Sequence, residues 1–105
     1  MQFIKVGKVT DYDVIPIKSI SMLGRKVGVI KRPDGSFYAI EVGCKHQGAD
    51  LTNGTIKDGI VTCPRHGWQY DLETGECLNA VSSNLRRHEL KIEDGVIMVS
   101  LHPIR

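Results

Sequence analysis

The chain has 105 residues, with 14 Lys and Arg against 12 Asp and Glu, and its formal net charge is +2. This size suits a single domain spanning residues 1–105, and the nearly balanced charge predicts no nucleic-acid partner. No run of about eighteen apolar residues occurs, so we predict no membrane span, and residues 1–10 lack the apolar core of a signal peptide. We therefore expect a cytoplasmic protein.

Alternation of apolar and polar residues with a period of two dominates the chain and predicts β-strands. In chain order, we expect strands over residues 3–6, 13–20, 26–31, 37–42, 55–56, 60–62, 68–72, 85–93 and 96–101. Asp-Gly pairs that begin at Asp34, Asp58 and Asp94 predict the turns of three hairpins. Pro16 cannot donate to a ladder, so its strand should lie at an edge or carry a bulge. These signals predict an all-β domain without a sustained helix.

Two short stretches each combine a thiol with an imidazole, namely Cys44-Lys45-His46 and Cys63-Pro64-Arg65-His66. Sixteen residues separate the two stretches. Glycine and proline around both predict loops, and four soft ligands on two facing loops predict a metal site. Zinc is one candidate, although structural zinc sites tend to pair Cys with Cys and His with His. A [2Fe–2S] cluster with two Cys on one iron and two His on the other matches the mixed pairs better.

The two stretches extend into a double motif, C-x-H-x-G-A-D-L from Cys44 to Leu51 and C-P-x-H-G-W-x-Y from Cys63 to Tyr70. This double motif resembles the Rieske iron–sulfur family. The resemblance implies a Rieske-like antiparallel β-sandwich in which residues 43–70 form a small cluster-binding subdomain inserted at the tip. It also implies that one [2Fe–2S] cluster per chain is bound by four residues: Cys44, His46, Cys63 and His66.

The mixed ligand set has a consequence for the reduction potential. Two thiolates roughly cancel the charge of two ferric ions and two sulfides, whereas four thiolates would leave a dianion. Because an electron is added more easily to a neutral centre, His46 and His66 should raise the potential to about −150 to +300 mV.

Several positions differ from the high-potential respiratory members of the family. Those members join their ligand loops by a disulfide, and Ala49 and Arg65 stand at the matching positions here. They also have a Ser after the His-Gly pair, where Trp68 stands, whereas Tyr70 matches the position whose hydroxyl donates to a cysteine sulfur. Many members cover the cluster with a proline-bearing segment, but residues 79–82 contain no proline. We therefore expect a low-potential ferredoxin, at about −150 to 0 mV.

Other polar residues have weaker signals. Lys45 and Arg65 each lie between a Cys and a His and should point outward beside the cluster, either as solvated charges or as docking contacts for an acidic partner. Cys77 is left without a partner and is expected to be a small, partly buried apolar residue. His88 and His102 have no partner at metal spacing and are expected to be structural or surface residues.

The chain is too short for a second cofactor domain and has no nucleotide-binding fingerprint. We therefore predict an electron carrier and not an enzyme. The resemblance implies a shuttle that takes electrons from a flavin reductase to a terminal oxygenase or another acceptor. Three alternatives remain: a small redox subunit of a larger reductase such as nitrite reductase, a structural zinc-binding module, and a redox sensor. The sequence pattern does not indicate whether the protein is a monomer or an oligomer.

Overall fold

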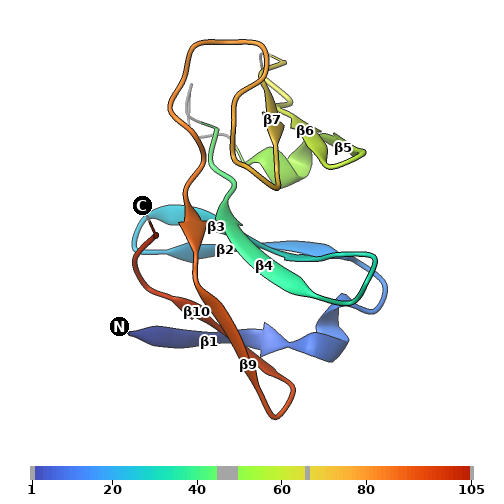
Figure 1. The fold of residues 1–105 in the computed structure, drawn as a ribbon, viewed down its shortest axis with the longest axis vertical. Coiled ribbons are helices and arrows are strands. Elements are labelled where there is room, and N and C mark those ends of the chain that lie inside the picture. The colour runs from blue at the N-terminus through green and yellow to red at the C-terminus, as the bar shows by residue number, and fades with distance from the viewer. Residues whose placement is uncertain (1, 45–49, 66, 105) are drawn as a thin grey trace.

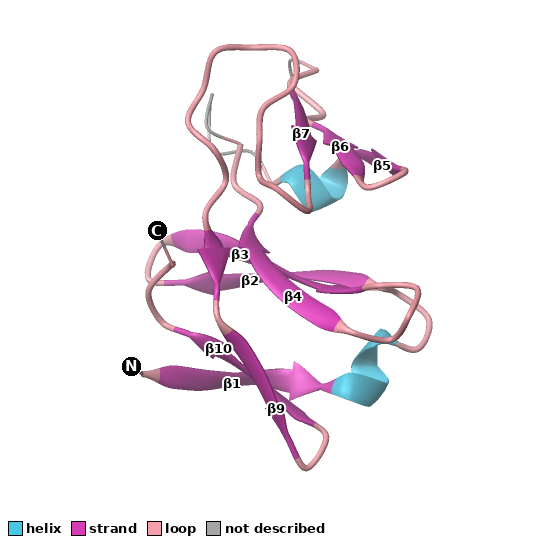
Figure 2. Ribbon diagram, viewed as in Figure 1, coloured by secondary structure: helices cyan, strands magenta, loops and turns pink. Residues whose placement is uncertain are grey.

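The computed structural model describes residues 2–44, 50–65 and 67–104, and within them the chain is built mainly of β-strands (Figure 1). In these described residues, ten strands form three antiparallel sheets (Figure 2). The helices in the described residues are short 3₁₀-helices, η1 (Val9–Tyr12) and η2 (Leu51–Asn53). The predicted all-β class is therefore confirmed.

The three sheets are stacked, and we name them by their place in the stack (Figure 1). The basal sheet contains, in spatial order, β1 (Phe3–Lys8), β10 (Val96–Ser100) and β9 (Leu90–Glu93). The central sheet contains β2 (Ile17–Met22), β3 (Arg25–Lys31), β4 (Phe37–Glu41) and β8 (Arg87–His88). The tip sheet contains β5 (Thr55–Lys57), β6 (Ile60–Thr62) and β7 (Gln69–Asp71).

The central sheet is covered on both faces. Residues 27–30 of β3 and residues 38–41 of β4 are buried without interruption. Since successive side chains of a strand point to opposite faces, an unbroken buried run requires a layer on each side. Val29 packs in a core with residues of the basal sheet, while Ile30 and Ile40 belong to a second core shared with the tip. The central sheet is thus the common wall of two cores.

The chain passes between the central sheet and the tip at a single neck (Figure 1). It leaves at the end of β4 and returns at the start of β8, where Ile40 pairs with Arg87. Beyond this pair, the Glu41 amide donates to the Arg86 carbonyl at 2.8 Å, and the Glu41 carboxylate accepts from the Arg86 amide at 2.9 Å. The entry and exit of the tip segment therefore lie side by side. The division of the chain at residues 43–70 stays a prediction.

Several strands differ in extent from the prediction. The strand expected over residues 13–20 begins only at Ile17, so Pro16 precedes it and its carbonyl accepts from the Lys31 amide at 2.8 Å. The strand expected over residues 85–93 is two strands, because the chain crosses from the central sheet to the basal sheet at Glu89. The strand expected over residues 68–72 is shorter, as β7.

The crossing at Glu89 is held by Ser100 of β10. The Ser100 hydroxyl accepts from the Glu89 amide at 3.0 Å, and the Ser100 carbonyl accepts from Nδ1 of His88 at 2.9 Å. His88 is buried at this crossing, whereas His102 is exposed. His88 thus joins the two sheets of the sandwich.

Tight turns join the two strands of each hairpin. Asp58 and Asp94 adopt left-handed conformations, with φ of +53° and +52°, and each is followed by a glycine, as the Asp-Gly pairs predict. Leu23, with φ of +50°, makes a similar turn before Gly24 that the sequence pattern did not reveal. Leucine has no special tolerance for this conformation.

Candidate metal centre

The predicted site residues divide into those the structure describes and those it does not. Lys45, His46 and His66, together with Ala49, lie outside the described residues. Cys44 and Cys63 are both about 3% exposed, and both belong to the core between the central sheet and the tip. The fold therefore brings together the two predicted thiols from loops that are far apart in sequence.

The first ligand loop is closed where it joins η2. Gly43 and Asp50 form an antiparallel bridge, and the Leu51 amide donates to the Val42 carbonyl at 2.7 Å. The Asp50 carboxylate caps η2 by accepting from the Thr52 amide at 2.9 Å and the Thr52 hydroxyl at 2.6 Å. These contacts fix both ends of the loop.

Asp50 also links this loop to the central sheet. Partial burial raises the pKa of Asp50, but hydrogen bonds from Thr52 and Ser19 and the positive charge of Lys26 outweigh the burial and hold this pKa below its ordinary value. Ser19 belongs to β2 and Lys26 to β3. The ionised carboxylate therefore connects the first ligand loop to two central strands.

The second ligand loop is a compact turn. The Cys63 amide donates to the Trp68 carbonyl at 2.7 Å, and the Gly67 amide donates to the Cys63 carbonyl at 3.1 Å. Gly67 has φ of +75°, a left-handed conformation that suits glycine. Arg65 is exposed in this turn, and Trp68 is half-buried against the core. The turn thus directs Cys63 inward and Arg65 outward.

Gly54, which joins η2 to β5, lies against the end of β6 directly before Cys63. A Cβ on Gly54 would overlap the carbonyl oxygen of Thr62, and it would lie 3.2 Å from Cδ of Pro64. Glycine is required here by close backbone approach and not by its φ of −92°. This contact fixes the segment after η2 against the start of the second ligand loop.

Tyr70 lies directly beside one of the thiols. Its side chain is fully buried in β7, and its hydroxyl is 3.9 Å from Sγ of Cys44, within hydrogen-bonding reach of sulfur. A thiolate at Cys44 can only accept, so the hydroxyl would be the donor. Cys77 pairs with Tyr70 through the backbone and is partly buried against the same core.

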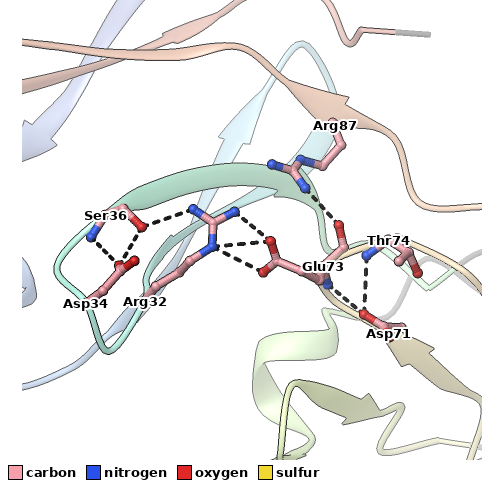
Figure 3. A network of polar contacts seen from close by, with 7 residues as sticks. All are labelled: Arg32, Asp34, Ser36, Asp71, Glu73, Thr74 and Arg87. Atoms are coloured by element: carbon pink, nitrogen blue, oxygen red, sulfur yellow. Dashed lines mark hydrogen bonds and ion pairs between the residues drawn. The ribbon is translucent and has the colours of Figure 1, made fainter.

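A polar network ties the turn after β7 to the central sheet (Figure 3). The Arg32 guanidinium binds the Glu73 carboxylate, with Nη2 and Oε1 2.6 Å apart, and Nη1 of Arg87 donates to the Glu73 carbonyl at 2.7 Å. Both guanidiniums lie over the ring of Tyr38, at 4.3 and 4.8 Å from its centroid. The hydrogen bond from Arg32 holds the pKa of Glu73 below its ordinary value. No local sequence pattern predicts this network, since Arg32 and Glu73 are 41 residues apart.

The donor set fits an iron–sulfur cluster. None of the cysteines, Cys44, Cys63 and Cys77, forms a disulfide, and the first two are buried in one core with a hydroxyl beside Cys44. Buried thiols with a neighbouring hydrogen-bond donor are suited to anionic sulfur ligands.

Comparison with known protein families gives a match to the Rieske [2Fe-2S] domain over residues 2–89. The chain belongs to the Rieske [2Fe-2S] family. This confirms the predicted family, and it does not favour the structural zinc module. Within the described residues, no helix is long and apolar enough to cross a membrane.

Two of the Rieske relatives differ in how much of their length this chain covers. The ferredoxin component of the alkene monooxygenase system of Xanthobacter autotrophicus is 29% identical over 83 residues, which cover 78% of this chain and 68% of the relative. A cholesterol 7-desaturase of Hemicentrotus pulcherrimus is 36% identical over 64 residues, which cover 60% of this chain and only 14% of the relative. The chain therefore spans a small part of the larger relatives.

Solved Rieske structures share the fold over almost the whole chain. A chain from the complex of reduced oxygenase and oxidized ferredoxin in carbazole 1,9a-dioxygenase superposes with a TM-score of 0.83 and 26% identity, covering 98% of this chain and 96% of that one. The ferredoxin of carbazole 1,9a-dioxygenase from Nocardioides aromaticivorans gives a TM-score of 0.81 at 22% identity, with coverage of 97% and 100%. The predicted Rieske-like antiparallel fold is confirmed.

Proposed function

We propose that this chain is a one-electron carrier that takes electrons from a flavin reductase and passes them to a terminal oxygenase or another acceptor. The observation that carries the proposal is similarity along most of both chains to ferredoxins of oxygenase systems, in sequence and in fold. The larger oxygenase and desaturase relatives match only through a short part of their length. The chain thus corresponds to the electron-carrying component.

The proposed cofactor is a single [2Fe–2S] cluster bound by four residues: Cys44, His46, Cys63 and His66. When bound, the cluster takes up and releases one electron. The two buried cysteines would supply thiolate ligands from opposite loops, in a core that limits solvent access. The Tyr70 hydroxyl would donate to the Cys44 sulfur. This hydrogen bond would stabilise the additional negative charge of the reduced cluster.

The partners proposed for the carrier are redox proteins. Arg65 is exposed in the second ligand loop, close to the buried Cys63, where a positive charge would help an acidic partner to dock. Lys45, the other proposed docking residue, lies outside the described residues. Association of this kind is expected to weaken as salt is added.

Spectroscopy of the purified protein tests the cofactor directly. We expect a brown protein with iron and acid-labile sulfide in equal amounts, and an EPR signal only after one-electron reduction. A colourless protein containing zinc would contradict the proposal. Transfer to a Rieske oxygenase should then be followed by stopped-flow absorption, with an Arg65→Glu variant in parallel. Equal rates for both proteins at every salt concentration would remove Arg65 from the docking surface.

A further inference from the structure

A third segment crosses the tip beside the second ligand loop. It follows β7 and runs over the top of the tip before it returns to β8 (Figure 1). Its first part lies along β7, because Cys77 pairs with Tyr70 and the Leu78 amide donates to the Gln69 carbonyl at 2.8 Å. Residues 79–82 of this segment contain no proline, in contrast to the proline-bearing segment that many members of the family have there.

Asn79 makes the side-chain contacts between this segment and the loop. Its Nδ2 donates to the Gly67 carbonyl at 2.9 Å, and its Oδ1 accepts from the Gln69 amide at 2.9 Å. The two backbone groups lie on either side of Trp68. A single amide therefore fixes the chain before and after this residue, an arrangement that we call the Asn79 bridge.

The chemistry of the bridge is specific to an amide. The Gly67 carbonyl needs a donor and the Gln69 amide needs an acceptor, and asparagine offers both on adjacent atoms. Aspartate would keep the acceptor but would place a second oxygen against the Gly67 carbonyl. Leucine has nearly the same shape and offers neither. The backbone of Leu78 is bonded to β7, and this places the neighbouring Asn79 beside the loop.

The Asn79 bridge contacts the backbone next to two of the proposed cluster ligands. Gly67 directly follows His66 in the sequence, and its amide also bonds to the carbonyl of Cys63. Movement of Gly67 would therefore shift the backbone next to one proposed ligand and loosen the turn that carries the other. Its φ of +75° gives this position a conformation that few other residues would hold.

We propose that Asn79 is a positioning residue that holds the second ligand loop in its ligating conformation through its bonds to Gly67 and Gln69. The inference rests on the proposed function, in which Cys63 and His66 bind the cluster. Loss of the bridge should leave cluster assembly intact, since the four ligands remain. It should let the loop open more often, so that the cluster is lost faster and its magnetic environment becomes less uniform.

The test compares the cluster-containing protein with three variants at this position, Asn79→Ala, Asn79→Asp and Asn79→Leu. Asn84→Ala is the matched control, because Asn84 is an exposed asparagine of the same segment whose side chain bonds to none of the described residues. The rate of cluster loss in excess chelator is measured by visible absorption, the cluster environment by EPR of the reduced protein, and global stability by denaturant unfolding.

We expect all variants to be isolated with a full cluster, and the three Asn79 variants to lose it roughly three- to tenfold faster than wild type, as the loss of one or two hydrogen bonds would allow. Their EPR lines should broaden or shift, while Asn84→Ala matches wild type. Equal rates in wild type and Asn79→Ala would overturn the inference. So would faster loss that only follows a fall in global stability, with EPR lines unchanged. A wild-type protein without a cluster would overturn the proposed function first, and this inference with it.

Discussion

The sandwich formed by the basal and central sheets differs from the tip in how it is held together. In the sandwich, β2 and β3 pair over six residues, and buried aliphatic side chains such as Val29 and Val99 fill the core. In the tip, each strand has three residues, and the buried core includes Cys44, Cys63 and Tyr70. Two cysteines and a tyrosine replace part of the aliphatic packing there.

This difference shows that the sandwich has a core between its own two sheets, whereas the core of the tip is completed by the central sheet. A three-stranded sheet with such short strands buries little apolar surface of its own. The tip depends instead on the face of the central sheet, on the network around Glu73 and, as we propose, on its cofactor. Substitutions in the tip should therefore destabilise the tip while the sandwich stays folded.

The largest effect is expected from Cys63→Ala. Removal of one thiolate should abolish cluster assembly, and because metal binding contributes to folding, the tip should lose protection from hydrogen exchange. The amides of β3 and β4 should stay protected, since their ladder and the sandwich core are untouched. Mass spectrometry of exchanged peptides measures both regions. Cys77→Ala is the control and should keep the cluster. Stoichiometric iron and sulfide in Cys63→Ala would remove Cys63 from the ligand set.

Gly54→Ala should give the next largest effect. The new methyl group would overlap the Thr62 carbonyl, and the backbone shift needed to relieve the overlap costs about 1–3 kcal/mol. Denaturant unfolding of the cluster-containing protein measures the loss. Gly43→Ala is a matched control, because a Cβ there meets no atom of the described residues within 4 Å. Equal stability of the two variants would show that the close approach of Gly54 to Thr62 is not tightly constrained.

Tyr70→Phe should lower the reduction potential by a few tens of millivolts. The substitution removes the hydroxyl beside Cys44 while the ring still fills the core. Only the difference in hydrogen-bond strength between oxidation states counts, and about 59 mV corresponds to a tenfold change for one electron. Direct voltammetry of both proteins measures the shift. An unchanged potential would mean that the hydroxyl does not interact differently with the two oxidation states.

Glu73→Gln should give the smallest effect, a loss of about 0.2–1 kcal/mol, because the Arg32–Glu73 pair is partly exposed to solvent. Glu76→Gln is the control, an exposed carboxylate of the same turn without an ion pair among the described residues. The wild-type advantage should shrink in high salt. Salt-independent stability in both proteins would contradict a role for this pair.

The same pair predicts a dependence on pH. Since Arg32 holds the pKa of Glu73 below its ordinary value of 4.5, the pair stabilises the folded state fully above that pH. The contribution is lost as pH falls through the lower pKa of the folded protein. Unfolding midpoints of wild type and Glu73→Gln should therefore converge in acid. A difference that persists at the lowest pH would assign the stabilisation to another cause.

The sequence predicted best those features that depend on neighbouring residues. Asp58 and Asp94 were identified as turn residues because Asp-Gly pairs tolerate left-handed backbone. Period-two patterning identified β3 and β4, but it could not show that both faces of these strands are covered, since that depends on what packs against them. The change of sheet at Glu89 was missed for the same reason.

The candidate site shows the same limit. The spacing of Cys44 and Cys63 with their histidines predicted a metal centre from local pattern alone. The contacts of Asn79 with the second ligand loop and of Arg32 with Glu73 join residues from different parts of the fold. Asparagine, arginine and glutamate are ordinary surface residues, so nothing in the sequence marks these positions.

The neck between Glu41 and Arg86 makes the tip a transplantable module. The two strands are already paired where the tip segment begins and ends, so a turn of about two residues would close them into a hairpin. The named strands of the sandwich would keep their pairing, although the bond from the Val42 amide to the Lys26 carbonyl would be lost, and the tip of another Rieske protein could be grafted at the same point. Excision alone would leave Ile30 and Ile40 facing water, and a sandwich designed to stand without a tip would need polar residues there.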